Sequence, residues 1–196
     1  MSYTLRVGTR QELGRVYRQM RRDFHAYERM PRLTLVRAMD RGQQELLLLE
    51  ENGNPAGYAI CCHPGRDGYV LLNYLAVDST RRGSGAGSAF LREICRRYAA
   101  QQGLIIELTE TPGEGGDTLR RERFYRRAGA ETVASDYRLC GVPTRLMVIP
   151  LSGPADISGR VHEILPEIYR RSMAAWVVKK IIDIRPVSGP DRRRSE

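Results

Sequence analysis

Hydrophobic positions near the start of the chain recur every three or four residues, which places them on one stripe of an amphipathic helix. Thr9 and Glu12 have the spacing of a capping box, so they predict the first residue of this helix. Pro31 ends it, and a second helix is expected over 33–41. The stripe of the first helix contains Leu13, Val16, Tyr17, Met20, Phe24 and Tyr27.

Short apolar runs bounded by turn residues predict strands. The runs 45–49 and 55–62 flank the dipeptide Asn52-Gly53, which accepts positive φ and is typical of a β-hairpin. The run 69–77 is almost continuously apolar, so we expect a strand that is buried on both faces. A further short strand is expected over 4–7.

A glycine-rich segment, 82–88, follows the apolar strand and opens a helix that the pattern places over 84–101. The next apolar run, 104–109, must be parallel to strand 69–77, because a helix-length crossover joins the two. The remaining predicted elements of this region are a helix over 118–128 and a hairpin of strands 132–139 and 144–150.

This order predicts an α+β fold in α/β/α layers, with a mixed, mostly antiparallel central sheet of six to seven strands and one parallel βαβ crossover. We expect residues 1–152 to form one domain and 153–186 to be a C-terminal extension packed on it. Residues 187–196 are expected to be a flexible basic tail. The apolar run 176–184 fits a helix or a strand equally well.

The 196-residue chain has a formal net charge of +9, and much of the excess lies in arginines around 81–97 and 120–127. This placement suits a phosphate-bearing small ligand as well as it suits DNA. The cysteines and histidines have no metal-ligand or disulfide spacing, so we expect no metal, reduced thiols and a cytoplasmic protein. They are Cys61, Cys62, Cys95, Cys140, His25, His63 and His162. No apolar run predicts a signal or membrane segment.

The glycine-rich segment has the properties of a phosphate-binding turn, because glycines allow close approach and the following helix presents free N–H groups. A P-loop needs a Gly-Lys-Ser/Thr sequence that is absent here. A Rossmann fingerprint would have Ser88 in place of its third glycine, with Glu107 as the ribose-binding acid. A dinucleotide-binding protein, or a tight turn without a ligand, therefore stays open at this point.

Arg82, Gly85 and Gly87 resemble the acetyl-CoA signature of the GNAT superfamily of N-acetyltransferases, in which Arg or Gln is followed by two residues, Gly, one residue and Gly or Ala. The run Phe124-Tyr125 with Gly129 is similar to a second family motif, although Ala130 replaces its usual aromatic residue. The resemblance covers roughly three quarters of the chain. It implies acetyl-CoA as acyl donor, an amine acceptor and direct attack on the thioester.

The resemblance also implies where the coenzyme lies. In the family, the strand before the glycine segment separates from its parallel neighbour and the pantetheine arm pairs with the exposed strand edge. The residues that this implies for coenzyme binding are Leu75, Ala76, Val77, Arg82, Gly83, Ser84, Gly85, Ala86, Gly87, Ser88 and Tyr125.

Acetyl transfer to an amine needs a base and an acid. An amine with a pKa near 10.4 is neutral at pH 7 in only about one molecule in 2,500, a cost of roughly 4.6 kcal/mol. We expect Glu107 or Glu110 to be the base, and strand alternation places them on opposite faces. Tyr125 matches the family's tyrosine and is our general acid. A covalent acyl-enzyme on Cys61 or Cys62 is disfavoured, because paired strand cysteines are usually buried.

Two other function classes remain: a non-catalytic acyl-CoA-binding sensor and a nucleic-acid-binding protein, of which we favour neither. We expect a small-molecule acceptor rather than a protein, no membrane partner, and a pattern compatible with a homodimer. The segment 111–117 is a candidate lid. The expected acceptor is a cationic amine in an acidic pocket formed by Asp23, Glu28, Glu107, Glu110 and Glu114.

Overall fold

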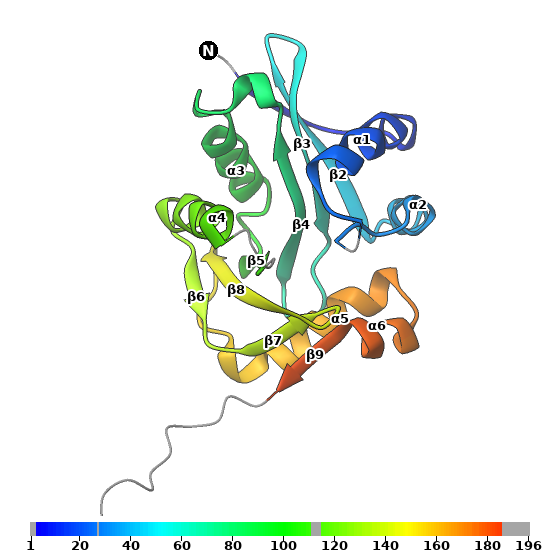
Figure 1. Ribbon diagram of the computed structural model, residues 1–196, viewed down its shortest axis with the longest axis vertical. Helices are drawn as coiled ribbons and strands as arrows, with labels where there is room; N and C mark the ends of the chain where they lie inside the picture. Colours follow the sequence, from blue (N-terminus) through cyan, green and yellow to red (C-terminus); the bar gives the residue numbers. More distant parts are fainter. Residues whose placement is uncertain (1–2, 27, 111–114, 186–196) are drawn as a thin grey trace, which may run out of the picture.

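The computed structural model describes residues 3–26, 28–110 and 115–185 of the chain (Figure 1). The first half contains β1 (Tyr3–Val7), α1 (Arg10–Asp23), α2 (Arg32–Asp40), β2 (Gln44–Glu51), β3 (Asn54–Cys62), β4 (Tyr69–Val77) and the 3₁₀ turn η1 (Ser79–Arg81). The second half contains α3 (Ala86–Arg97), β5 (Gly103–Thr109), α4 (Gly115–Arg127), β6 (Glu131–Val133), β7 (Asp136–Leu139), β8 (Val142–Pro150), η2 (Ser158–Arg160), α5 (Val161–Ser172), α6 (Ala175–Ile181) and β9 (Ile182–Arg185).

The strands form one mixed sheet in the order β1-β2-β3-β4-β5-β8-β7-β9, with β6 also paired to β8. Within the described part of the chain, β4 and β5 are the one parallel pair. The predicted fold class and its single crossover are therefore confirmed. The described sheet has nine strands, however, which is more than the six to seven expected.

Two local features account for the additional strands. The predicted strand 132–139 is interrupted, because β6 pairs with residues 146–148 of β8 whereas β7 pairs with 142–143. The ambiguous run 176–184 is both a helix and a strand: α6 ends at Ile181, and β9 then pairs antiparallel with β7. A short apolar run carries no period that could separate these two states.

Helices cover both faces of the sheet (Figure 1). One hydrophobic cluster joins α3 and Tyr125 of α4 to one face, and the other joins α1, α2 and α5 to the opposite face. Helix α5 buries Ile164, Leu165 and Ile168 to 1% exposure or less, so it forms part of this second core. The proposed tail, 187–196, lies outside the described residues.

A β-bulge in the middle of β4 shapes the centre of the sheet. Ile60 of β3 pairs with Tyr74 and Cys61 pairs with Leu72, which leaves Asn73 as the extra residue. On the other side of β4, the parallel pairing with β5 ends at Leu72 and Ile106. The two strands therefore separate at the bulge, and among the described residues no strand pairs with the C-terminal half of β4 on its β5 side.

The N-terminus of α1 carries the predicted capping box. The Thr9 side chain accepts from the Glu12 backbone N–H, and Glu12 accepts from the Thr9 N–H at 2.8 Å. Arg6 also donates to Glu12 at 2.7 Å. Hydrogen bonds from Arg6 and then from Thr9 lower the pKa of Glu12 to about 2.

We expect Glu12→Gln to lower the free energy of unfolding at pH 7 by about 1 kcal/mol, because it removes a partly exposed ion pair and keeps an N3 residue that can cap. The native carboxylate stabilises the fold above pH 4.5, and this contribution is lost as the pH falls towards 2. Urea unfolding at several pH values should therefore show the wild-type and variant curves converging in that window. A difference that stays constant down to pH 2 would contradict the ion-pair origin.

Candidate active site

The turn between β4 and α3 owes its shape to two glycines. Gly83 has φ of 83° and Gly85, the N-cap of α3, has φ of 86°. A Cβ atom built at either position meets nothing within 4 Å. The left-handed backbone, rather than a lack of space, is therefore what requires glycine at these two positions.

The amides of this turn divide into two groups. Those of Arg82 and Ser84 donate within the turn, to Ser79 O at 3.3 Å and Arg81 O at 3.4 Å. Five others have no hydrogen-bond partner among the described residues, and no side chain caps α3. They belong to Gly83, Gly85, Ala86, Gly87 and Ser88. A helix N-terminus with free amides and an exposed Arg82 beside it is a site for an anion such as a diphosphate.

The unpaired edge of β4 supplies further backbone groups. The Asp78 N–H donates to Ala56 O at 2.9 Å, so the two-residue period of an antiparallel strand turns Ala76 towards β3 as well. Leu75 and Val77 therefore direct their N–H and C=O groups to the side that β5 has left. An extended ligand arm can pair there as an additional strand.

A cleft of about 610 Å³ runs along this edge and ends at the glycine turn. Leu75, Ala76, Val77 and Arg82 line one side of it, and Asp117, Arg120 and Arg121 line it from α4. The end of α1 and the following loop close it, through Arg22, Asp23, Phe24, His25 and Glu28. Of the residues that the sequence predicted for coenzyme binding, Leu75, Ala76, Val77 and Arg82 line this cleft, whereas Tyr125 and the glycine turn after Arg82 lie outside its lining.

Tyr125 lies on the α3 and α4 side of the sheet and is 8% exposed. Its ring contacts that of Phe124 at 4.9 Å between centroids, and Phe124 in turn packs beside Gly87 of α3. Burial raises the pKa of Tyr125, and nearby Arg121 opposes this shift. Its hydroxyl donates to no residue that the structure describes, so it is free to donate to a ligand atom.

Glu107 lies on the opposite face of β5 from the neighbouring core residues Ile106 and Leu108. It accepts hydrogen bonds from Tyr137 at 2.7 Å and from Tyr169 at 2.6 Å. Burial raises the pKa of Glu107, and the two tyrosine hydroxyls only partly oppose that shift. The raised pKa brings the carboxyl group closer to the range of a general base.

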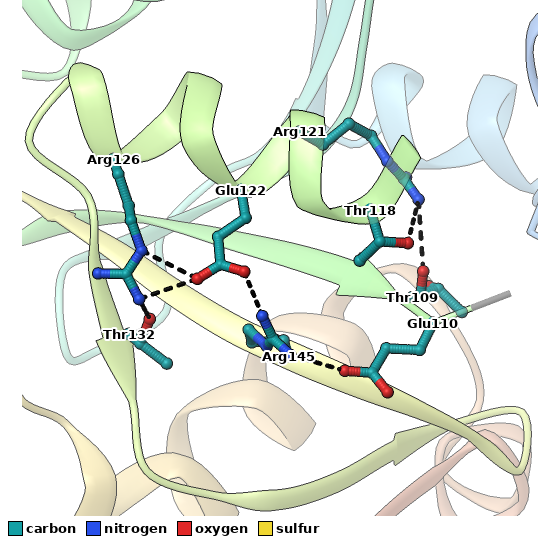
Figure 2. Close-up of polar contacts among 8 residues, drawn as sticks. All are labelled: Thr109, Glu110, Thr118, Arg121, Glu122, Arg126, Thr132 and Arg145. Atoms are coloured by element: carbon teal, nitrogen blue, oxygen red, sulfur yellow. Dashed lines mark hydrogen bonds and ion pairs between the residues drawn. The ribbon is translucent and has the colours of Figure 1, made fainter. Parts of the chain in front are cut away.

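Glu110 is on the α4 side of the sheet, so the structure does not bring it together with Glu107. Figure 2 shows Arg145 between Glu110 and Glu122 of α4, and Arg126 on the other side of Glu122. Glu110 lies 3.0 Å from Arg145 and its side chain is 46% exposed. This arrangement makes Glu110 part of a surface ion-pair network that joins the end of β5 to α4 and β8.

A second cavity, of about 640 Å³, opens beside the bulge on the α2 and α5 face of the sheet. Asn73, Tyr74 and Tyr169 line it, and Glu28 lines both cavities. Because Tyr169 donates to Glu107, this cavity lies next to the carboxyl group. The sequence missed the contribution of α5 and α6 to it: the helical period from Ile157 to Tyr169 predicts a helix but carries no motif for a site.

The expected acidic pocket does not form. Asp23 accepts from Tyr58 at 2.8 Å, and Glu110 pairs with Arg145 on the other side of the sheet. Glu114 lies outside the described residues, as does most of the candidate lid. Among the residues that line the second cavity, Glu28 is the one acid. Because side chains along β5 alternate between the two faces of the sheet, Glu107 and Glu110 lie on opposite faces although they are close in sequence.

The cysteines and histidines show no sign of a reactive or metal site. Cys61 and Cys62 are buried, and burial raises the pKa of both thiols, so they remain protonated at neutral pH. The described residues contain no group of His, Cys, Asp and Glu side chains that could hold a metal ion. They also contain no helix that is long and apolar enough to cross a membrane.

Comparison with known proteins gives a family match and many structural matches. Residues 42–129 match an acetyltransferase (GNAT) domain. A putative GNAT-family acetyltransferase from Bacteroides thetaiotaomicron shares the fold with a TM-score of 0.65 and 20% identity, over 91% of this chain and 99% of that one. No curated protein matches the sequence.

Two further structures have named activities. The ribosomal-protein-S18-alanine N-acetyltransferase from Escherichia coli matches with a TM-score of 0.59 and 19% identity, over 80% of this chain and 98% of that one. The spermidine/spermine N-acetyltransferase from Vibrio cholerae matches with a TM-score of 0.58 and 11% identity, over 77% of this chain and 96% of that one. At these identities the structures support a shared fold and leave the acceptor open.

Proposed function

Since the chain contains an acetyltransferase (GNAT) domain over residues 42–129, we propose that its two cavities hold acetyl-CoA and an amine on either side of the bulge in β4. The main observation behind this proposal is that β4 separates from β5 just before the N-terminus of α3, where several backbone amides are free. The bound coenzyme supplies an acetyl thioester whose carbonyl carbon an amine can attack.

The residues of the first cleft fit this coenzyme. The free amides of Gly83, Gly85, Ala86, Gly87 and Ser88 and the charge of Arg82 match a diphosphate. The backbone of Leu75 and Val77 matches the amides of an extended arm, and the N–H of Leu75 is a candidate donor to the acetyl oxygen. These assignments require no side chain to move out of the turn, because it is open in the structure.

Glu107 is our proposed base. It takes a proton from the acceptor ammonium, directly or through a water molecule, so that the nitrogen lone pair becomes available to form the bond to the acetyl carbon. Tyr137 and Tyr169 are positioning residues, because their hydroxyl groups hold both carboxylate oxygens. Glu110 is a poorer candidate because Arg145 already neutralises it on the far face.

Tyr125 is our proposed partner for the leaving sulfur. Its hydroxyl stays protonated at neutral pH, because burial raises its pKa. It can therefore donate a hydrogen bond to the sulfur as the C–S bond breaks. The CoA thiolate leaves more readily than the amine would, because the ordinary pKa of a thiol is about 8.5. We therefore expect Tyr125 to contribute less to the rate than the base does.

We expect Tyr125→Phe to lower kcat by about 10-fold to 100-fold, within the lower part of the range for general acids. The substitution removes one hydroxyl that no described residue uses, so the unfolding midpoint and the Kd for CoA should stay close to wild type. Thiol release under saturating acetyl-CoA and acceptor measures the effect. Full turnover by the variant would remove Tyr125 from the mechanism.

The proposed function as a whole is tested by calorimetric titration with CoA together with thiol release from acetyl-CoA across a panel of primary amines. We expect CoA binding and amine-dependent thiol release. Tight CoA binding with no release for any amine would favour a non-catalytic acyl-CoA sensor. No CoA binding at all would contradict the assignment of the cleft.

A further inference from the structure

The second cavity is lined by an excess of positive charge. Its volume of about 640 Å³ is within the range of sites for small molecules. Five of its lining residues are arginines and one is an acid, which leaves four positive charges in excess. These residues are Arg29, Arg37, Arg41, Arg170, Arg171 and Glu28.

Most of these arginines are not neutralised by the protein. Arg37, Arg41, Arg170 and Arg171 form no ion pair or side-chain hydrogen bond with any described residue. Other arginines of the chain do: Arg97, for example, donates to Glu45 at 2.6 Å. The charge around the cavity is therefore available to a ligand.

The arginines come from two elements that face each other across the cavity. Arg37 and Arg41 are four residues apart at the C-terminal end of α2, so they lie on one face of that helix. Arg170 and Arg171 are in the last turn of α5. An anion between these two pairs can meet guanidinium groups from both sides, and guanidinium groups bind carboxylates and phosphates in a bidentate manner.

The cavity also has a direction. Its floor is formed by Tyr74 and Tyr169, which are 4% and 3% exposed, and Tyr169 donates to Glu107. The arginines Arg37 and Arg171 are exposed and lie at the mouth. Glu107 thus lies behind Tyr169, beyond the residues that line the cavity, and the positive charge is at the outer end.

We propose that the acceptor is a small primary amine that also carries an anionic group, a carboxylate or a phosphate. The amine points towards Asn73 and Glu107, and the anion binds the arginines of α2 and α5. This inference rests on the proposed function and specifies its acceptor class. It also replaces the cationic acceptor that the sequence suggested, because a second ammonium group would lie among like charges.

Four acceptors of similar length test the charge preference: propylamine, 1,3-diaminopropane, 3-aminopropanoate and 2-aminoethyl phosphate. We expect kcat/KM for one of the two anionic amines to exceed that for the neutral and dicationic amines by at least about 10-fold, the effect of one charged hydrogen bond. The two anionic probes separate a carboxylate from a phosphate. The rates are measured by release of CoA thiol at fixed ionic strength.

Charge-removing variants locate the preference. Arg37→Gln and Arg171→Gln should each raise KM for the preferred anionic amine by about 10-fold with little change in kcat, and the Kd for CoA should not change. The matched controls are Arg32→Gln on α2 and Lys180→Gln on α6, which remove the same charge outside the cavity. The controls should leave KM unchanged.

The outcomes separate this inference from the function on which it rests. Turnover that is equal or better with propylamine or 1,3-diaminopropane would overturn the anionic acceptor and leave the acetyltransferase assignment intact. Equal KM values in the Arg37, Arg171 and control variants would overturn the proposed binding site. A protein that binds CoA and releases no thiol with any of the four amines, nor with a wider amine panel, would contradict the proposed function itself.

Discussion

Replacing Gly85 by aspartate should weaken CoA binding by about 5-fold to 1,000-fold. The new carboxylate would stand at the N-cap of α3, next to the amides that we assign to the diphosphate. Two like charges about 4 Å apart repel by roughly 1 kcal/mol in water and roughly 4 kcal/mol near a protein surface, which sets the range. Aspartate tolerates positive φ better than most residues, so the fold should survive. Calorimetric titration with CoA measures the change.

Gly129→Asp is the matched control for this variant. Gly129 also has positive φ, of 89°, and a Cβ there meets nothing within 4 Å. It follows the C-terminal end of α4, whereas the cleft residues Asp117 and Arg120 lie at the other end. We expect this control to bind CoA normally. Equal losses in both variants would show that strain or net charge, rather than the position of the carboxylate, causes the effect.

Glu107→Gln should lower kcat by about 100-fold to 10,000-fold, the usual contribution of a general base. The amide cannot take a proton from the acceptor, but it keeps the size of the side chain: its oxygen can accept from one of the two tyrosine hydroxyls and its NH2 can donate to the oxygen of the other. The Kd for CoA should stay unchanged, because Glu107 does not line the coenzyme cleft. Glu110→Gln provides the discriminating comparison, and we expect it to lower kcat less than about 2-fold. The reverse result would assign the base to Glu110.

The pH dependence gives an independent check on Glu107. A base acts in its ionised form, so wild-type kcat should rise with pH through a pKa above the ordinary 4.5, because burial raises that pKa. The variant should lack this rising limb. The same raised pKa means that ionisation destabilises the folded state as pH rises from 4.5 through the folded value, so Glu107→Gln should unfold no earlier than wild type at pH 7. A wild-type profile that is flat over this range would contradict the assignment.

The sequence predicted those parts of the fold that local rules control. The capping box at Thr9, the Asn52-Gly53 turn and the period of α1 each depend on a few neighbouring residues, and each is present. The crossover from β4 to β5 followed from the length of the intervening helix. The bulge at Asn73 could not be predicted, because it depends on the register of β4 against β3, and an almost continuously apolar strand has no sequence pattern that indicates it.

The candidate site divides in the same way. The glycine turn could be found from its motif, because its chemistry uses backbone groups that the sequence itself specifies. The acceptor side could not be found in this way, since Arg37 and Arg171 are 134 residues apart and line one cavity only because α2 and α5 pack on the same face of the sheet. The two candidate bases, Glu107 on β5 and Glu110 directly after that strand, are three residues apart, and only the fold shows that Arg145 of β8 pairs with Glu110.

A crystal structure of the chain with CoA is the most direct test of the central claim. We expect diphosphate oxygens within about 2.7–3.2 Å of the amides of Gly85 to Ser88. We also expect a pantetheine arm hydrogen-bonded to Leu75 and Val77 between β4 and β5. CoA bound at another surface, or β4 and β5 paired beyond Leu72 and Ile106 with no arm between them, would contradict the proposed coenzyme site.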